Sequence, residues 1–284
     1  MENNFLQWGV EGLDDRRNNA SLAELKYLSY LSTLYLHITD PMILPKNLSV
    51  ILILTNEMNL MMKQKLCMQI EFPNLEDLKL SSIEVEKIWQ DQPGELSYWF
   101  LRLTSLIVEG CGNLKYLFTT SMVESLAQLK RLELCDCEHM EEIIIKNGLG
   151  EAENVRGMML PKLESLKLKG LSNLTRFCTG HLIQCYFLQE LWIQNCPGLK
   201  TFISNSLSTD AVANNQFEET NSTLFDEKFA FSNIEKLRIL GMDNLNMIWH
   251  TDFHSDSFCK LKVLKVQQGQ IVEYFPTQYD EKIS

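Results

Sequence analysis

Positive charge is scarce in this sequence, and long apolar runs are absent. The 284 residues include 26 lysines and arginines against 37 aspartates and glutamates, which gives a net charge of −11. Because phosphate contacts supply most of the sequence-independent affinity for nucleic acids, this balance disfavours a general nucleic-acid binder, although it does not exclude a local basic face. No apolar stretch reaches membrane-spanning length, and the opening MENNFLQWGVEGLDDRR lacks the basic end and apolar core of a secretory signal. We therefore expect a cytoplasmic protein with no membrane insertion.

Groups typical of catalytic or metal sites are few. The eight cysteines are spread over a chain too long to need disulfides, so we expect most of them to be small buried hydrophobic residues. His139 lies among glutamates in CEHMEE, but no second histidine completes a zinc-binding His-Glu-x-x-His motif. Cys178, His181 and Cys185 are three neighbouring ligand types, whereas a structural zinc site usually has four. No set of nucleophile, base and orienting group is recognisable, so we predict no enzyme activity, no metal and no cofactor.

The chain does contain a recurring pattern, Leu-x-x-Leu-x-Leu with Ile or Val allowed. It begins at nine positions, which are Leu31, Leu48, Leu75, Leu103, Leu129, Leu163, Leu188, Ile234 and Leu261. Five of the eight intervals are 25 to 28 residues long, within the range of leucine-rich repeats. Leu166 and Leu168 would point to the same side of a short strand, and one repeat can bury such a pair only by stacking on its neighbours. The pattern therefore predicts a leucine-rich-repeat solenoid of the α/β class. We expect a curved horseshoe with parallel strands on its concave face and short helices, 3-10 turns and loops on its convex face.

A second apolar set follows the strands and predicts further inward positions. Four repeats align as VEGCGNLKYLF, LKGLSNLTRFC, IQNCPGLKTFI and ILGMDNLNMIW. The first slot of this alignment holds Cys111, Leu171, Cys196 and Met242, the second Leu114, Leu174, Leu199 and Leu245, and the third Leu117, Phe177, Phe202 and Ile248. The repeat that begins at Leu129 fits with Cys137, Met140 and Ile143, whereas the one that begins at Leu75 is a residue short.

These repeats predict one domain. We place it at residues 21–275, with about nine repeats, between an irregular segment at 1–20 and a tail at 276–284. The two longest intervals, of 34 and 46 residues, contain polar stretches without the leucine period. They predict loop insertions near 145–158 and 204–230.

Two features near the start of the chain are less regular. The 17-residue interval is too short for a full repeat, so we expect a compact or degenerate unit near 41–53. Ser21 and Glu24 form a capping-box pattern ahead of leucines at helical spacing, which predicts a short helix before the first strand.

Alternate strand positions should face away from the core. Over the nine strands they hold seven basic and four acidic residues, a net +3. This count fits a mildly basic concave stripe that faces an acidic partner, and it equally fits a solvated sheet that tolerates lysine and arginine. Trp192 lies between inward Leu191 and Ile193, so its ring must point outward, where aromatic side chains often form binding hot spots. Trp89 and Trp249 follow isoleucines in a different slot and are predicted to be core residues. The candidate protein-binding face comprises Tyr35, Lys79, Arg131, Glu133, Lys167, Lys169, Trp192, Arg238 and Lys265.

Longer phrases give the chain a resemblance to one family. They are NASLAELKYLSYLSTLYLHITDPMILP, FPNLEDLKL, EGCGNLKYLF, SMVESLAQLKRLELCDCEHMEEII, EKIWQD and NMIWHTD. Together they resemble the leucine-rich-repeat region of plant intracellular disease-resistance proteins of the coiled-coil, nucleotide-binding, leucine-rich-repeat type, over essentially the whole chain. Such receptors carry a nucleotide-binding switch before the repeats. This chain contains no Gly-x-x-x-x-Gly-Lys-Ser/Thr phosphate loop, so nucleotide handling is not assigned to it.

The resemblance implies a recognition module of plant immunity. Its partner would be a pathogen effector, a guarded host protein or a neighbouring receptor domain, and in a complete receptor the repeats would also regulate the switch. Repeat spacing leaves one alternative open, a generic leucine-rich-repeat scaffold or adaptor without an immune role.

Overall fold

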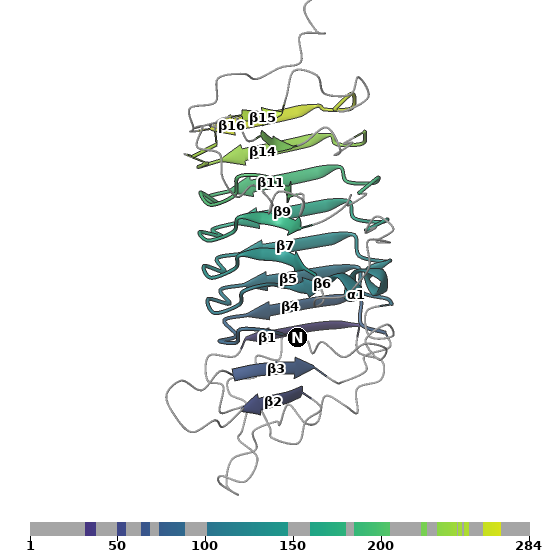
Figure 1. Cartoon of the computed structure of the whole chain (residues 1–284). Helices are drawn as coiled ribbons and strands as arrows, with labels where there is room; N and C mark the ends of the chain where they lie inside the picture. The colour runs from purple at the N-terminus through teal and green to yellow at the C-terminus, as the bar shows by residue number, and fades with distance from the viewer. Residues whose placement is uncertain are drawn as a thin grey trace, which may run out of the picture.

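The computed structural model describes residues 32–37, 50–54, 64–68, 74–88, 101–146, 160–179, 185–204, 223–225, 232–242, 244–245, 247–249 and 258–267. Through most of them the chain winds as a solenoid with one strand of a long sheet in each layer (Figure 1). We call this the main sheet. Its eight parallel strands are, in spatial order, β1 (Thr33–His37), β4 (Asp77–Ser81), β5 (Ser105–Glu109), β7 (Arg131–Cys135), β9 (Ser165–Lys169), β11 (Glu190–Gln194), β14 (Lys236–Leu240) and β16 (Val263–Gln267). The predicted leucine-rich-repeat solenoid is confirmed.

The strands of the main sheet stack in phase. The second residue of each strand pairs with the second residue of the next, as Leu132 does with Leu166 and Leu166 with Leu191. In most layers the second and fourth residues are buried while the first, third and fifth are partly exposed, as expected from the two-residue period of a strand. The inward leucines therefore form one continuous core, and the outward side chains form rows across the layers.

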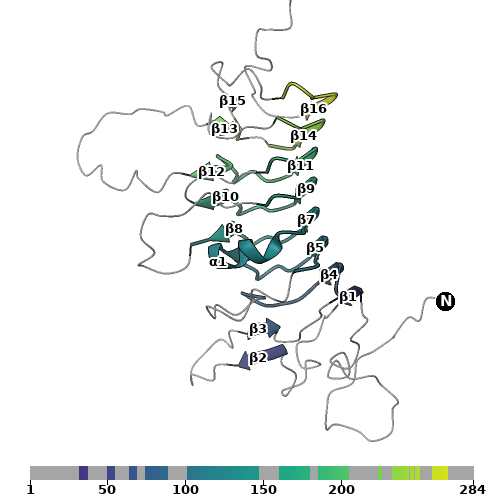
Figure 2. The same cartoon turned by 90° about the vertical axis from the view of Figure 1, so that its right-hand side faces the viewer.

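The side opposite the main sheet is built mainly from short strands (Figure 2). There β6 (Phe118–Thr119), β8 (Glu142–Ile145), β10 (Arg176–Thr179) and β12 (Ile203–Ser204) form a second parallel sheet. In the part of the chain that the structure describes, helical structure is limited to α1 (Thr120–Val123) and a 3-10 turn at Glu124–Leu126. Short strands thus occupy positions on this side where helices were predicted. The reason lies in sequences such as EIII and RFCT, because β-branched and aromatic residues favour extended backbone.

The predicted inward slots are confirmed. Every member of the three aligned slots is at most 3% exposed, as are Cys137, Met140 and Ile143 of the repeat that begins at Leu129. In the repeat that begins at Leu75 the slots are filled by Ile83, Val85 and Ile88, all buried. That repeat is one residue short because the Val85 N–H donates to the Ile83 carbonyl at 3.0 Å in a tight turn.

The strand expected from Leu48 does not join the solenoid as a layer, and this expectation was wrong. Residues Val50–Leu54 do form a strand, β2, but it pairs antiparallel with β3 (Gln64–Met68). β1 instead pairs directly with β4. The physical reason is length, since 17 residues cannot complete a turn that takes 25 to 28 elsewhere. Eight of the nine predicted strands therefore stack in the main sheet.

The insertion predicted at 204–230 is also corrected in part. Within it, β13 (Thr223–Phe225) returns to the solenoid and pairs in parallel with β15 (Met247–Trp249). Its Phe225 ring lies 5.7 Å from that of Phe202, which stacks in turn on Phe177 at 4.8 Å. The triplet TLF thus contributes buried side chains to the core. The sequence did not predict this because the residues around the triplet are polar and lack the leucine period.

Some expectations fall outside the described residues. These are the helix near Ser21, Trp89, the side chain of Trp249, His181 and most of both insertions. The domain boundaries stay a prediction.

The turn after each of the six strands β4, β5, β7, β9, β11 and β14 contains a residue with positive φ. In spatial order these residues are Ser82, Gly110, Asp136, Gly170, Asn195 and Gly241, with φ between 52° and 64°. Each N–H donates to the carbonyl of the last residue of the next strand, as the Asp136 N–H does to Lys169 at 2.8 Å. Glycine alternates with a larger residue because of space: a Cβ on Gly170 would lie 2.2 Å from Asp136 Oδ1. Glycine adopts the positive φ without strain at these positions, and its lack of a Cβ leaves room for the side chain of the preceding layer.

We predict that Gly170→Ala lowers the free energy of unfolding by about 1–2 kcal/mol, because an alanine would be strained at this φ and would meet Asp136. Gly112→Ala is the matched control, since a Cβ there meets nothing within 4 Å and its φ is not positive. Urea denaturation of both variants measures the effect. Adding Asp136→Gly to Gly170→Ala should recover part of the loss; equal stability of Gly170→Ala and Gly112→Ala would contradict this account.

Candidate protein-binding surface

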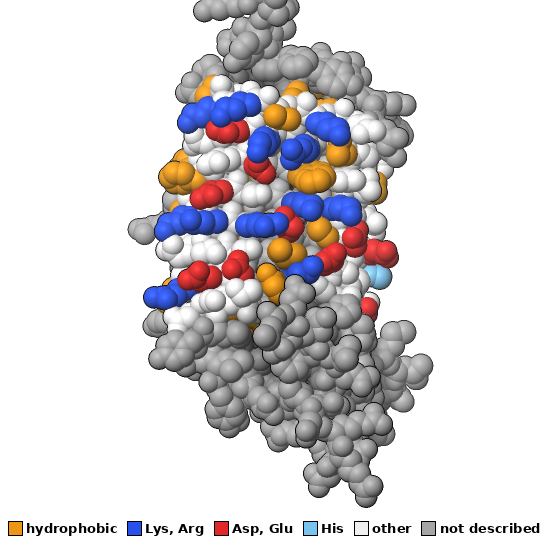
Figure 3. Space-filling model, turned by 180° about the vertical axis from the view of Figure 1, so that it is seen from behind, with side chains coloured by type: hydrophobic (Ala, Val, Ile, Leu, Met, Phe, Trp, Pro, Cys, Tyr) orange, Lys and Arg blue, Asp and Glu red, His pale blue; other side chains and the backbone are white. Residues whose placement is uncertain are grey.

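The exposed side of the main sheet carries the candidate residues. We call the first, third and fifth residues of its eight strands the outer face. Figure 3 shows this side, with lysines and arginines distributed over the layers and acidic and hydrophobic side chains between them. All nine candidates belong to it: Arg131 in the first row, Tyr35, Lys79, Glu133, Lys167, Trp192, Arg238 and Lys265 in the middle row, and Lys169 in the last row. Their role in binding stays a prediction.

Trp192 lies in the middle row of the outer face, on β11. On the two neighbouring strands it pairs with Lys167 and Arg238. Lys167 Nζ lies 4.9 Å from the ring centroid and Arg238 Cζ lies 5.3 Å from it, both within cation–π range. The indole Nε1 is buried and has no hydrogen-bond partner among the described residues. The ring points outward as predicted, but it is held between two cations and is only half-exposed.

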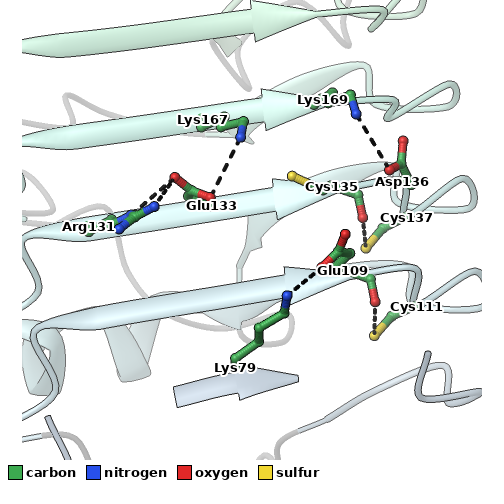
Figure 4. Close-up of polar contacts among 10 residues, drawn as sticks. All are labelled: Lys79, Glu109, Cys111, Arg131, Glu133, Cys135, Asp136, Cys137, Lys167 and Lys169. Carbon is green, nitrogen blue, oxygen red and sulfur yellow. Dashed lines mark hydrogen bonds and ion pairs between the residues drawn. The ribbon is translucent and has the colours of Figure 1, made fainter. Parts of the chain in front are cut away.

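Carboxylates pair with several of the cations (Figure 4). Lys79 Nζ lies 2.7 Å from Glu109 Oε2, and Arg131 Nη2 lies 2.7 Å from Glu133 Oε1. The hydrogen bond between Lys79 and Glu109 raises the pKa of the lysine and lowers the pKa of the glutamate, so both groups stay charged at neutral pH. Exposed pairs of this kind stabilise a fold by at most about 1 kcal/mol, so their main effect here is to neutralise charge on the surface.

Sequence reasoning missed one exposed aromatic pair. Tyr186 and Phe187 are 45% and 57% exposed in the turn that leads into β11, the strand of Trp192. Aligning the repeats on the first leucine of the motif reveals the signal. Tyr186 and Phe187 then occupy the positions that hold Pro161 and Lys162 one layer earlier, which is a surface turn.

The other residues weighed for chemistry have structural surroundings. His139 lies exposed on a turn, where its Nδ1 is 2.5 Å from the Gly112 carbonyl oxygen of the neighbouring layer. Cys137 is fully buried, as its slot predicts, and its Sγ donates to the Cys135 carbonyl at 3.4 Å. Within the described ranges no three His, Cys, Asp or Glu side chains are grouped to hold a metal ion. The absence of metal, cofactor and catalysis stays a prediction.

Comparison of the sequence with known proteins identifies the family of the chain. The model of the family described as RPS2-like plant disease resistance protein, leucine-rich repeats, matches residues 74–216, half of the chain. The chain belongs to this family. One similar relative is a probable disease resistance protein of Arabidopsis thaliana, 31% identical over 130 residues. The match covers 45% of this chain and 14% of that relative, so this chain corresponds to a small part of the relative's length. No solved structure matches.

The match covers five of the eight strands that carry the outer face. Residues 74–216 include the strands β4, β5, β7, β9 and β11, and therefore the layer of Trp192. Among the described residues, no helix is both long and apolar enough to cross a membrane.

The cysteines of this repeat region provide a test of its core. Burial raises the pKa of Cys178 and Cys185 to about 12 and that of Cys196 to about 11, whereas Cys259 is exposed. A pKa of about 12 leaves roughly one thiol in ten thousand ionised at pH 8. We therefore predict that iodoacetamide alkylates Cys259 in the native protein at least about a hundredfold faster than these three, as followed by peptide mass spectrometry. In denaturant all four should react at similar rates, and rapid native alkylation of Cys196 would show that its layer is open.

Proposed function

We propose that this leucine-rich-repeat region is a recognition module of plant defence that binds a protein partner through the outer face of the main sheet. The partner is a pathogen effector, a guarded host protein or a neighbouring domain of a longer receptor. The observation that carries the proposal is the placement of all nine candidate residues on one continuous sheet face, with Trp192 and its two cations in the middle row of that face. Tryptophan and arginine are enriched among the residues that dominate protein interfaces.

The architecture supports recognition by a rigid surface. On the strands β4, β5, β7, β9, β11 and β14, each outward middle residue stands on a strand that is hydrogen-bonded to its neighbours and lies between two buried aliphatic residues. Binding therefore requires little ordering of the backbone, which favours affinity. In a longer receptor, a partner that prefers the active arrangement would shift the switch toward it by its difference in affinity for the two states.

The alternative of a generic scaffold uses the same surface but has no role in defence. The family match favours the defence role, since the matched family is defined by plant disease resistance proteins. The identity of the partner distinguishes the two functions.

The experiment uses the tagged full chain, expressed in leaf tissue and isolated with its partners for quantitative mass spectrometry. Three variants are compared with the wild type: Trp192→Ala, Lys167→Glu with Lys169→Glu, and the control Lys115→Glu with Lys200→Glu. The control has the same change in net charge, but its two exposed lysines lie on turns outside the main sheet. We predict that binding of a purified partner falls at least about tenfold in the first two variants and is unchanged in the control, because only they alter the outer face.

A defence role further requires that the partner be a pathogen protein or a component whose loss changes defence-linked cell death in the leaf. Equal binding by all variants would overturn the proposed surface. A partner without any effect on cell death would favour the scaffold.

A further inference from the structure

The net positive charge of the outer face lies in one half of it. In the first four layers, β1 to β7, the outer face has two basic and three acidic residues, a net −1. In the last four layers, β9 to β16, it has five basic residues and one acidic residue, a net +4. Glu164, Glu235 and Lys262, at the entrances of the last four strands, lower this to +3. The whole chain has a net charge of −11, so this half stands out as a local basic face.

The two halves also differ in how their cations are paired. Lys79 and Arg131, in the first half, each lie 2.7 Å from a glutamate. Lys167, in the second half, lies 3.7 Å from Glu133, which already binds Arg131. Arg238 and Lys265 have no carboxylate partner among the residues that the structure describes. Lys236 pairs with Glu190, and Lys169 Nζ lies 4.0 Å from Asp136 Oδ2. Both cations of the first half are therefore paired with carboxylates, whereas Arg238 and Lys265 of the second half remain available and Lys167 shares its carboxylate.

Trp192 lies between two of the cations of the second half, Lys167 and Arg238. Lys167, Trp192, Arg238 and Lys265 are the middle residues of four consecutive strands. Tyr186 and Phe187 are exposed in the turn that leads into the same strand. A carboxylate that binds Lys167 or Arg238 would draw the cation away from the indole ring.

We propose that the β9 to β16 half of the outer face docks an acidic protein segment, with its carboxylates on Lys167 and Arg238 and with Trp192 between them. This rests on the proposed function and narrows it to one half of the face and one partner chemistry. Lys167 and Arg238 lie two strand spacings apart, about 10 Å. In a segment of polyproline II conformation, side chains three residues apart share one face and are separated by about 9 Å, which matches this span. The segment thus carries Asp or Glu at every third position. Complementary charge gives such a contact its specificity and its rate of association.

The experiment measures binding of a fluorescent peptide with glutamate at every third position and serine elsewhere to the purified full chain at low ionic strength. A peptide with glutamine in place of each glutamate is the ligand control. Lys167→Ala with Arg238→Ala is compared with Lys79→Ala with Arg131→Ala, which changes the net charge equally in the other half. We expect the first pair to weaken binding on the order of tenfold and the second to have little effect. The tryptophan emission of the wild type should change on binding, and that of Trp192→Phe should not.

Three results would overturn the inference. These are absence of glutamate-dependent binding, equal weakening by both pairs, and binding of a single-stranded DNA of equal charge that is at least as tight and equally sensitive to the first pair. The last result would identify a general polyanion site.

Binding of a defence partner to these variants distinguishes a wrong docking half from a wrong function. A defence partner that is lost on Lys79→Ala with Arg131→Ala, but not on Lys167→Ala with Arg238→Ala, would leave the function in place and refute the docking half. A partner insensitive to both pairs and to Trp192→Ala would refute both.

Discussion

The structure depends on hydrogen bonding between identical positions of successive layers. A single layer has a strand of only five residues, and its two inward leucines cannot be buried without a layer on each side. The ladder begins before the strand, where the Gln189 N–H donates to Glu164 and the Glu235 N–H to Gln189, both at 2.8 Å. It continues through the strand and ends in the turn, at the residue with positive φ. Stability is thus shared between neighbouring layers, and a change in one layer acts first on the two beside it.

This constraint also produces the candidate binding surface. Because the inward positions are in phase from layer to layer, the outward positions are in phase too, and side chains distant in sequence become neighbours. Trp192 lies between cations that are 25 residues before it and 46 residues after it. Selection on the outward rows can change what the face binds without disturbing the core, which is how one fold serves different partners.

Most of the core could be predicted from the sequence, and the exceptions have physical causes. The burial of Cys111, Leu171 and Phe177 followed from spacing alone, because each repeat must fill the same inward positions of the core. The 17-residue interval before Leu48 argued against a layer at VILIL, but the hairpin of β2 and β3 could not be predicted, because QKLCM carries no repeat pattern that would identify it as the partner strand. Of the candidate surface, the direction of each side chain was predictable from the two-residue period. The contacts of Trp192 and the pairing of each cation were not, because they depend on rotamers and on the order of layers across 46-residue gaps.

Amide hydrogen exchange resolved to single residues tests the continuous ladder most directly. The N–H groups of Gly110, Asp136, Gly170 and Asn195 lie in turns, yet each donates to the strand of the next layer at 2.8–2.9 Å. We predict that they exchange as slowly as amides inside β7, β9 and β11, because they open only when two layers separate. If these turn amides exchange at the rate of free peptide while the strands stay protected, the layers are joined by their strands alone and the account is wrong.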